Sequence, residues 1–326
     1  MCSGRGIIIV LLLVFMGVRT DAQQVSLYSQ YVLNNFLINP AIAGSNGLTT
    51  VNLTTRQQWI GFEEAPSTSA LSAQTLLQKN SYRSKKKPIR RKFSYNTLGG
   101  KVGLGGYIFS DRNGASSRTG ARFSYAYHLS NPQNKSQLSF GMSLTAYQIK
   151  FDEDRIILKD PDDDIWTNAR EAVFIPDADF GMYYQAPDYF AGFSVDQLLE
   201  SIMRFGEGNE NYKLERNYYL MGGYNFKLND DLILTPSTLL KFAENGAFQG
   251  DFGAKLIYDQ TFWGGLTYRT GSAIIVLGGL KIDPFIFGYS FDISLSSIMK
   301  HSFGSHEFVL AVMFGEKTRH YRWLNK

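Results

Sequence analysis

Residues 248–259 read FQGDFGAKLIYD and alternate with a period of two. One set of positions is apolar or aromatic, and the other carries glycine, polar or charged residues such as Asp251 and Lys255. Residues 139–148 (SFGMSLTAYQ) and 118–129 (RTGARFSYAYHL) repeat the pattern. Such alternation indicates a β-strand whose two faces meet different surroundings. Each run is about ten residues long, which is the length that a tilted strand needs to cross a membrane.

Strands of this kind recur through most of the chain. A soluble β-sandwich is the alternative, but its strands are usually about five to six residues long. The sequence therefore predicts an all-β fold, a transmembrane antiparallel β-barrel of the outer-membrane type over residues 48–314, with about 14 strands. The expected strands begin near Leu48, Ser67, Gly99, Arg118, Gln137, Ala178, Tyr189, Arg216, Asp231, Phe248, Phe262, Ala273, Phe285 and Glu307.

The lengths of the connections predict the orientation of the barrel. With the start of the first strand in the periplasm, most periplasmic connections are short, for example APD, YDQT and DP. The opposite set includes the long stretches Phe151–Pro176 and Gln197–Glu215. Short periplasmic turns and long outer loops are typical of outer-membrane barrels.

One periplasmic connection, Lys79–Asn96, is long and strongly basic. It is interpreted either as a solvated loop or as a docking site for an acidic periplasmic partner or anionic headgroups. Residues 315–326 form a second basic stretch, predicted as a periplasmic tail. The basic residues of the loop that are candidates for contact are Lys85, Lys86, Lys87, Arg90 and Arg91.

The N-terminus has the pattern of a secretory signal peptide over residues 1–22. Arg5 precedes an apolar run, Ile7–Val18, and small residues around Ala22 suit cleavage before Gln23. The run is too short to span a bilayer as a helix. Cys2 is the single cysteine, so the exported chain is expected to fold without a disulfide.

Two runs near the start of the exported chain are rich in Asn, Gly and Pro: QYVLNNFLINPAIAGS (30–45) and RQQWIGFEEAPST (56–68). They resemble the opening signature of the PorP/SprF family, outer-membrane proteins of the type IX secretion system. The resemblance extends over nearly the whole exported chain. Further segments match in the same order, among them IPDADFGMYY (175–184), RNYYLMGGYNF (216–226), ILTPSTLLK (233–241), WGGLTYR (263–269) and GYSFDIS (288–294).

The resemblance implies an outer-membrane barrel that supports secretion or cell-surface attachment of specific secreted proteins, such as the adhesins of gliding bacteria. It would act through protein–protein contacts. The implied partners are other type IX components, in the periplasmic ring or the outer-membrane translocon, the secreted surface protein and the lipid bilayer, but no nucleic acid. The alternative is a porin or small-solute transporter that acts through its lumen.

The segment 23–47 is expected to be a periplasmic lead-in to the first strand or a partial plug of the barrel mouth. A proline favours extended backbone in the residue before it, and a glycine permits a positive φ. Trp59 is expected as an aromatic anchor at the outer interface, with Arg56 near the same rim. The family signature selects Asn39, Pro40, Gly44, Arg56, Trp59 and Gly61 as candidate interaction residues.

Catalysis, cofactors and metals are not expected. The acidic stretch from Asp152 to Asp164 lacks the glycine and glutamate positions of a calcium-binding loop. No serine has the G-x-S-x-G surroundings of a nucleophile. The four histidines, His128, His301, His306 and His320, therefore suggest no catalytic site.

Overall fold

The computed structural model describes residues 29–31, 33–77, 99–152, 173–199, 202–204, 211–213 and 215–315. The predicted signal peptide and the predicted basic tail, apart from Gly315, lie outside these residues. So do the basic-loop residues Lys85, Lys86, Lys87, Arg90 and Arg91.

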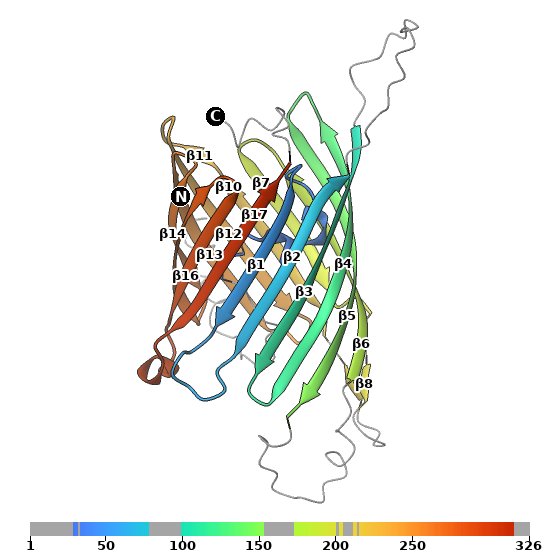
Figure 1. Ribbon diagram of the computed structural model, residues 1–326, viewed down its shortest axis with the longest axis vertical. Coiled ribbons are helices and arrows are strands. Elements are labelled where there is room, and N and C mark those ends of the chain that lie inside the picture. The colour runs from blue at the N-terminus through green and yellow to red at the C-terminus, as the bar shows by residue number, and fades with distance from the viewer. Residues whose placement is uncertain are drawn as a thin grey trace, which may run out of the picture.

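The described residues form a closed antiparallel barrel of 14 strands (Figure 1). β1 pairs with β17, and β10 pairs with β12, which closes the sheet. β10 and β11 make one crossing interrupted at Asn225, because both pair with β12. The barrel strands are β1 (Thr49–Gln57), β2 (Ser67–Leu77), β3 (Gly99–Asn113), β4 (Ser116–Asn131), β5 (Ser136–Phe151), β6 (Val173–Gln185), β7 (Tyr189–Asp196), β10 (Asn217–Tyr224), β11 (Phe226–Lys227), β12 (Leu232–Ala243), β13 (Phe248–Tyr258), β14 (Phe262–Arg269), β15 (Ala273–Ile282), β16 (Phe285–Ser294) and β17 (Ser305–Phe314).

A separate two-stranded sheet pairs β8 (Ile202–Arg204) with β9 (Asn211–Lys213). Three short 3₁₀ helices complete the described elements: η1 (Asn35–Leu37), η2 (Pro40–Ile42) and η4 (Ser297–His301). Within the described residues, no helix has the length and apolar character that a membrane crossing requires.

The sequence prediction of the barrel is confirmed, with differences in strand length. The first strand begins at Thr49 and the last ends at Phe314. The sixth strand begins at Val173 rather than at Ala178, because the pairing with β5 continues past Pro176. β3, β4 and β5 have 15, 16 and 16 residues, well above the ten expected for a simple crossing.

The two faces of the sheet have opposite character, as the alternation predicts. On β5, Ser143 is 3% exposed while the neighbouring Leu144 is 69% exposed. Inward-facing side chains are mostly polar, and outward-facing side chains are mostly apolar, as a membrane barrel requires. Exposed aromatic side chains lie at the strand ends that share one end of the barrel, where they form a girdle. They are Tyr189, Tyr224, Phe226, Tyr258, Phe262, Phe285 and Phe314.

The barrel has two distinct ends. The end at which β1 finishes carries the connections 152–172 and 197–216 and is named the loop end. The opposite end, where β1 begins and β17 finishes, is named the turn end and also bears the aromatic girdle. Its short connections are 132–135, 186–188, 228–231, 259–261 and 283–284.

Candidate functional site

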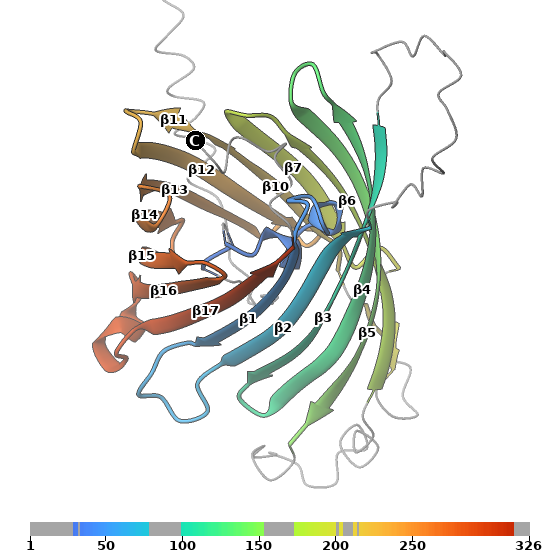
Figure 2. The same ribbon diagram turned by 45° about the horizontal axis from the view of Figure 1, so that its top comes forward.

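The N-terminal segment runs inside the barrel. Its described residues between Ser29 and Leu48, named the plug, lie within the ring of strands (Figure 2). Phe36 and Asn39 are 1% and 0% exposed, although the segment precedes the first strand. The described residues of this segment therefore lie inside the barrel, where most of them are buried among the strands.

The plug is shaped by local sequence. Asn39 caps η2, since its side-chain oxygen accepts a hydrogen bond from Ala41 N at 2.9 Å. Pro40 occupies the first helical position, where a missing N–H costs nothing. Gly44 has φ +72°, and a Cβ there would lie 2.4 Å from the Thr75 carbonyl oxygen. The Asn-Pro and Gly positions of the signature thus turn the chain inside the lumen.

Asn39 also ties the plug to the barrel wall. Its Nδ2 donates to the carbonyl oxygens of Met182 at 2.9 Å and Phe193 at 3.1 Å. These two residues are register partners on β6 and β7. One buried amide therefore binds two adjacent strands and caps a helix, using both donors and its acceptor.

Glycines in the wall make room for the plug. A Cβ at Gly103 would lie 1.8 Å from Ala43 O, and one at Gly141 would lie 2.3 Å from Ala41 N. A Cβ at Gly181 would lie 2.1 Å from Asn39 Oδ1. Any side chain at these positions would collide with the plug, so the wall and the plug fit each other as a unit.

Replacing Gly103 by alanine is expected to dislodge the plug. Access can be followed in an Ala41→Cys background, since Ala41 is 0% exposed and Cys2 precedes the predicted cleavage site. Each decrease of about 1.4 kcal/mol in the free energy needed to release the plug speeds maleimide labelling about tenfold. We expect Gly103→Ala to speed labelling at least tenfold. Gly264→Ala is the matched control, because its Cβ would face outward with its nearest atom, Leu277 O, at 3.8 Å. Equal labelling rates in both variants would contradict the fit.

Further polar contacts hold the plug along its length. His128 Nε2 and Ala43 O are 2.9 Å apart, and the His128 side chain is fully buried on β4. Ser194 Oγ donates to Ile38 O at 2.9 Å. Near the turn end, Gly44 N donates to Gln74 Oε1 at 3.1 Å. The plug thus contacts β2, β4 and β7, so its position is fixed against several separate strands.

The first described residues of the plug meet a buried charge cluster formed by Arg56, Asp292 and Glu307. Arg56 Nη2 lies 2.7 Å from Asp292 Oδ2, and Arg56 Nη1 lies 3.3 Å from Glu307 Oε2. Arg56 also contacts Ser29 Oγ. The backbone amides of Ser29 and Gln30 donate to Glu307 at 2.6 Å and 2.9 Å. Arg56 is therefore a lumen residue that joins the plug to the seam between β1 and β17.

A second ion pair extends this cluster. Arg269 Nη2 lies 2.8 Å from Asp251 Oδ2, and Arg269 Nη1 lies 3.8 Å from Asp292 Oδ2. Charges buried in this way are tolerated only when they are paired and hydrogen-bonded. The cluster thus links β1, β13, β14, β16 and β17 on the inside of the barrel.

Trp59 and Gly61 lie in the connection between β1 and β2, at the loop end. Trp59 N donates to Ser305 Oγ at 3.1 Å, and Ile60 pairs through its backbone with Gly304 and Phe303. Gly61 has φ +108°, and a Cβ there would lie 3.2 Å from the Phe303 ring. Residues 59–61 therefore connect the loop between β1 and β2 to the loop before β17 at the loop end, and they are not part of the plug.

Four of the six signature residues belong to the plug or contact it, at different points along its length. Asn39, Pro40 and Gly44 belong to the plug, and Arg56 contacts it. Asp292 and Glu307 were not selected from the sequence. In the sequence, each of them is a carboxylate at an inward-facing strand position. Such a position indicates an ion pair only when the cation opposite it is known. No group of acidic, histidine or cysteine side chains suited to a metal ion occurs among the residues that the structure describes.

Comparison with solved structures finds other barrels. The chain is similar to the translocator domain of the autotransporter NalP from Neisseria meningitidis (TM-score 0.40, 13% identity, 88% of this chain and 97% of that chain). It is also similar to a mutant of the TodX monoaromatic hydrocarbon channel (TM-score 0.43, 9% identity, 86% and 93%). A third is the beta domain of the Bordetella autotransporter BrkA (TM-score 0.34, 11% identity, 82% and 98%). The barrel architecture rests on the strand pairing itself.

No curated protein matches the sequence. A family profile described as "Type IX secretion system membrane protein PorP/SprF" matches residues 20–312, which is most of the chain. The match includes the plug, the buried Arg56 cluster and all but the end of the last strand. The chain therefore belongs to the PorP/SprF family of type IX secretion system membrane proteins.

Proposed function

We propose that this barrel supports the secretion or cell-surface attachment of specific secreted proteins, such as adhesins, through protein–protein contacts. Membership of the PorP/SprF family makes other secretion components its implied partners. The observation that carries the proposal is the plug. A lumen crossed by a buried, hydrogen-bonded segment is poorly suited to solute passage, whereas the surfaces at both ends remain open to proteins.

The orientation follows from the two ends of the barrel. We infer that the turn end faces the periplasm and the loop end faces the cell exterior, because outer-membrane barrels have short periplasmic turns and longer outer loops. The connections 152–172 and 197–216 would then meet secreted proteins, and the basic connection 78–98 would meet the periplasmic machinery. Both the barrel fold and the family fit the outer membrane.

Affinity capture of tagged protein from mildly crosslinked cells tests the proposal. We expect a secreted surface protein and other secretion components to co-purify. Replacing Lys85, Lys86 and Lys87 together by glutamine is expected to reduce recovery of periplasmic partners severalfold, because long-range charge attraction is lost. Lys135→Gln, in the connection 132–135, together with Lys227→Gln, in β11, removes exposed lysines near the turn end and serves as the control. Recovery of no secretion component from wild-type cells would overturn the proposal.

A further inference from the structure

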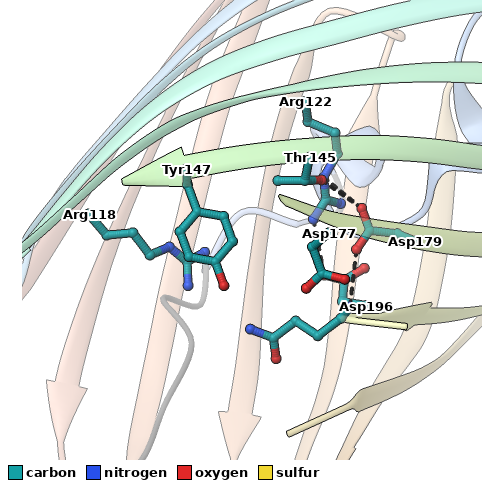
Figure 3. A pocket seen from close by; sticks show the side chains of 8 residues that line it. Arg118, Arg122, Thr145, Tyr147, Asp177, Asp179 and Asp196 are labelled. Carbon is teal, nitrogen blue, oxygen red and sulfur yellow. Dashed lines mark hydrogen bonds and ion pairs between the residues drawn. The ribbon is translucent and has the colours of Figure 1, made fainter. Parts of the chain in front are cut away.

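A second polar cluster lies in the lumen near the loop end, on the wall formed by β4, β5, β6 and β7 (Figure 3). It surrounds a small pocket. Asp196 is the last residue of β7, Gln197 is the first residue of the connection 197–216, and Tyr147 and Asp177 lie within a few residues of the connection 152–172 along β5 and β6. The lining residues are Arg118, Arg122, Thr145, Tyr147, Asp177, Asp179, Asp196 and Gln197.

Arg122 and Asp179 form the rigid part of this cluster. Arg122 Nε lies 3.1 Å from Asp179 Oδ2, and Arg122 Nη2 lies 3.5 Å from Asp196 Oδ2. Asp179 Oδ2 also accepts hydrogen bonds from Ser143 Oγ at 2.8 Å and Thr145 Oγ1 at 2.9 Å. Its Oδ1 accepts one from the Gln197 backbone N at 3.2 Å. Both oxygens of Asp179 are therefore in use, and both Arg122 and Asp179 are held in place.

Two other carboxylates keep an unused oxygen. Asp177 Oδ1 accepts from the backbone amides of Ala178 at 2.7 Å and Leu199 at 3.2 Å. Asp177 Oδ2 and Asp196 Oδ1 are buried and have no hydrogen-bond partner in the described structure. The residues themselves are only 3% and 8% exposed. Tyr147 is 3% exposed, and its hydroxyl is unpartnered too. In the same lining, Arg118 Nε and Arg122 Nη1 are also buried without a partner. Buried polar atoms without partners are rare and costly, which points to a missing ligand.

The charges of the lining are unequal. Three carboxylates, Asp177, Asp179 and Asp196, face two guanidinium groups. Arg122 is already shared between Asp179 and Asp196. The guanidinium carbon of Arg118 lies 5.1 Å from the Phe109 ring centre and 4.6 Å from that of Tyr147, and Arg118 makes no ion pair with another described residue. The lining itself thus carries one more carboxylate than guanidinium groups.

We propose that this pocket binds one organic cation, namely the guanidinium or ammonium group of an arginine or lysine side chain presented at the loop end by a partner polypeptide. Such a group donates several hydrogen bonds and can satisfy both unused carboxylate oxygens at once. One added cation makes the lining neutral. The assignment to a polypeptide rests on the proposed function, whereas the preference for a cation rests on the pocket alone.

Isothermal titration calorimetry of the purified full-length protein in uncharged detergent tests this site with three probes. They are N-acetyl-arginine amide, the neutral N-acetyl-glutamine amide and the anionic N-acetyl-glutamate amide. We expect saturable binding of the arginine probe only. Asp177→Asn and Asp196→Asn should each weaken it about tenfold or more, since a charged hydrogen bond is lost. Asp259→Asn is the matched control, because Asp259 is exposed in a connection at the turn end.

Heat-shifted migration in detergent gels verifies that each variant keeps its folded barrel. Binding of the glutamate probe, equal binding of all three probes, or no binding to folded wild-type protein would overturn the site. Undiminished arginine binding to both folded pocket variants would overturn it as well. Selective arginine binding without capture of any secreted protein or secretion component from cells would support the pocket and contradict only the proposed function.

Discussion

Removal of residues 29–47 is expected to turn a closed barrel into one that passes small sugars. The plug supplies Phe36 and Asn39 to the interior, both almost fully buried, and the glycines around it leave no side chains to fill its place. A barrel of 14 strands is wide enough to enclose a channel once it is emptied. Swelling of proteoliposomes in arabinose measures the change. We expect wild-type protein to give a swelling rate near that of empty liposomes, and the deletion variant to give a rate near that of a porin.

The barrel strands begin at Thr49, so this deletion leaves the closing pair of β1 and β17 intact. A variant with Gly and Ser in place of residues 29–47, at the same length, controls for the shortened chain and is expected to swell like the deletion. Heat-shifted migration verifies folding in both. A folded deletion variant that swells no faster than wild-type protein would show that something other than the plug closes the lumen.

Arg56→Ala is expected to destabilise the protein more than any other single change considered for the described residues. It leaves Asp292 and Glu307, which are 2% and 0% exposed, facing one another without the cation between them. Breaking a buried ion pair from one side typically costs about 3–5 kcal/mol. The substitution also removes a contact to Ser29, so the start of the plug loses its hold. Urea unfolding from liposomes, followed by tryptophan fluorescence, measures the change.

Arg112→Ala is the matched control, since Arg112 is an exposed residue of β3 near the same end of the barrel. Substitutions of exposed residues usually change stability by less than about 0.5 kcal/mol. Arg56→Lys adds a further comparison, because a lysine keeps the charge but loses the planar two-sided contact with the two carboxylates. If Arg56→Ala and Arg112→Ala have equal free energies of unfolding, the buried charge cluster around Arg56 has no structural role.

Most of the fold could be predicted from local pattern. Alternation fixes which side chains face the lumen, so the opposite faces of residues 139–148 and 248–259 follow directly from sequence. Most of the expected strand starts lie within a few residues of the observed ones. The sixth strand was expected to begin near Ala178, whereas β6 begins at Val173 and pairs with β5 on both sides of Pro176.

The site could be predicted only in part. The family signature selected Asn39 and Arg56, and the strand pattern placed Arg56 near the rim that Trp59 occupies, without indicating its partners. Its true surroundings depend on Asp292 and Glu307, which lie far away along the chain and approach only when β17 closes the barrel against β1. The partners of Asn39, Met182 and Phe193, are backbone carbonyls with no sequence signal at all. Long-range closure, not local propensity, creates these contacts.

The central claim is that the lumen is closed by the chain's own N-terminal segment and that the barrel works by contact. Planar-bilayer recording of the full-length protein tests it most directly. The plug, held by Asn39 to β6 and β7 and by the Arg56 cluster at the seam, predicts a flat baseline without steady open current at moderate voltage. A stable ohmic conductance of porin size from the intact, folded protein would contradict the account.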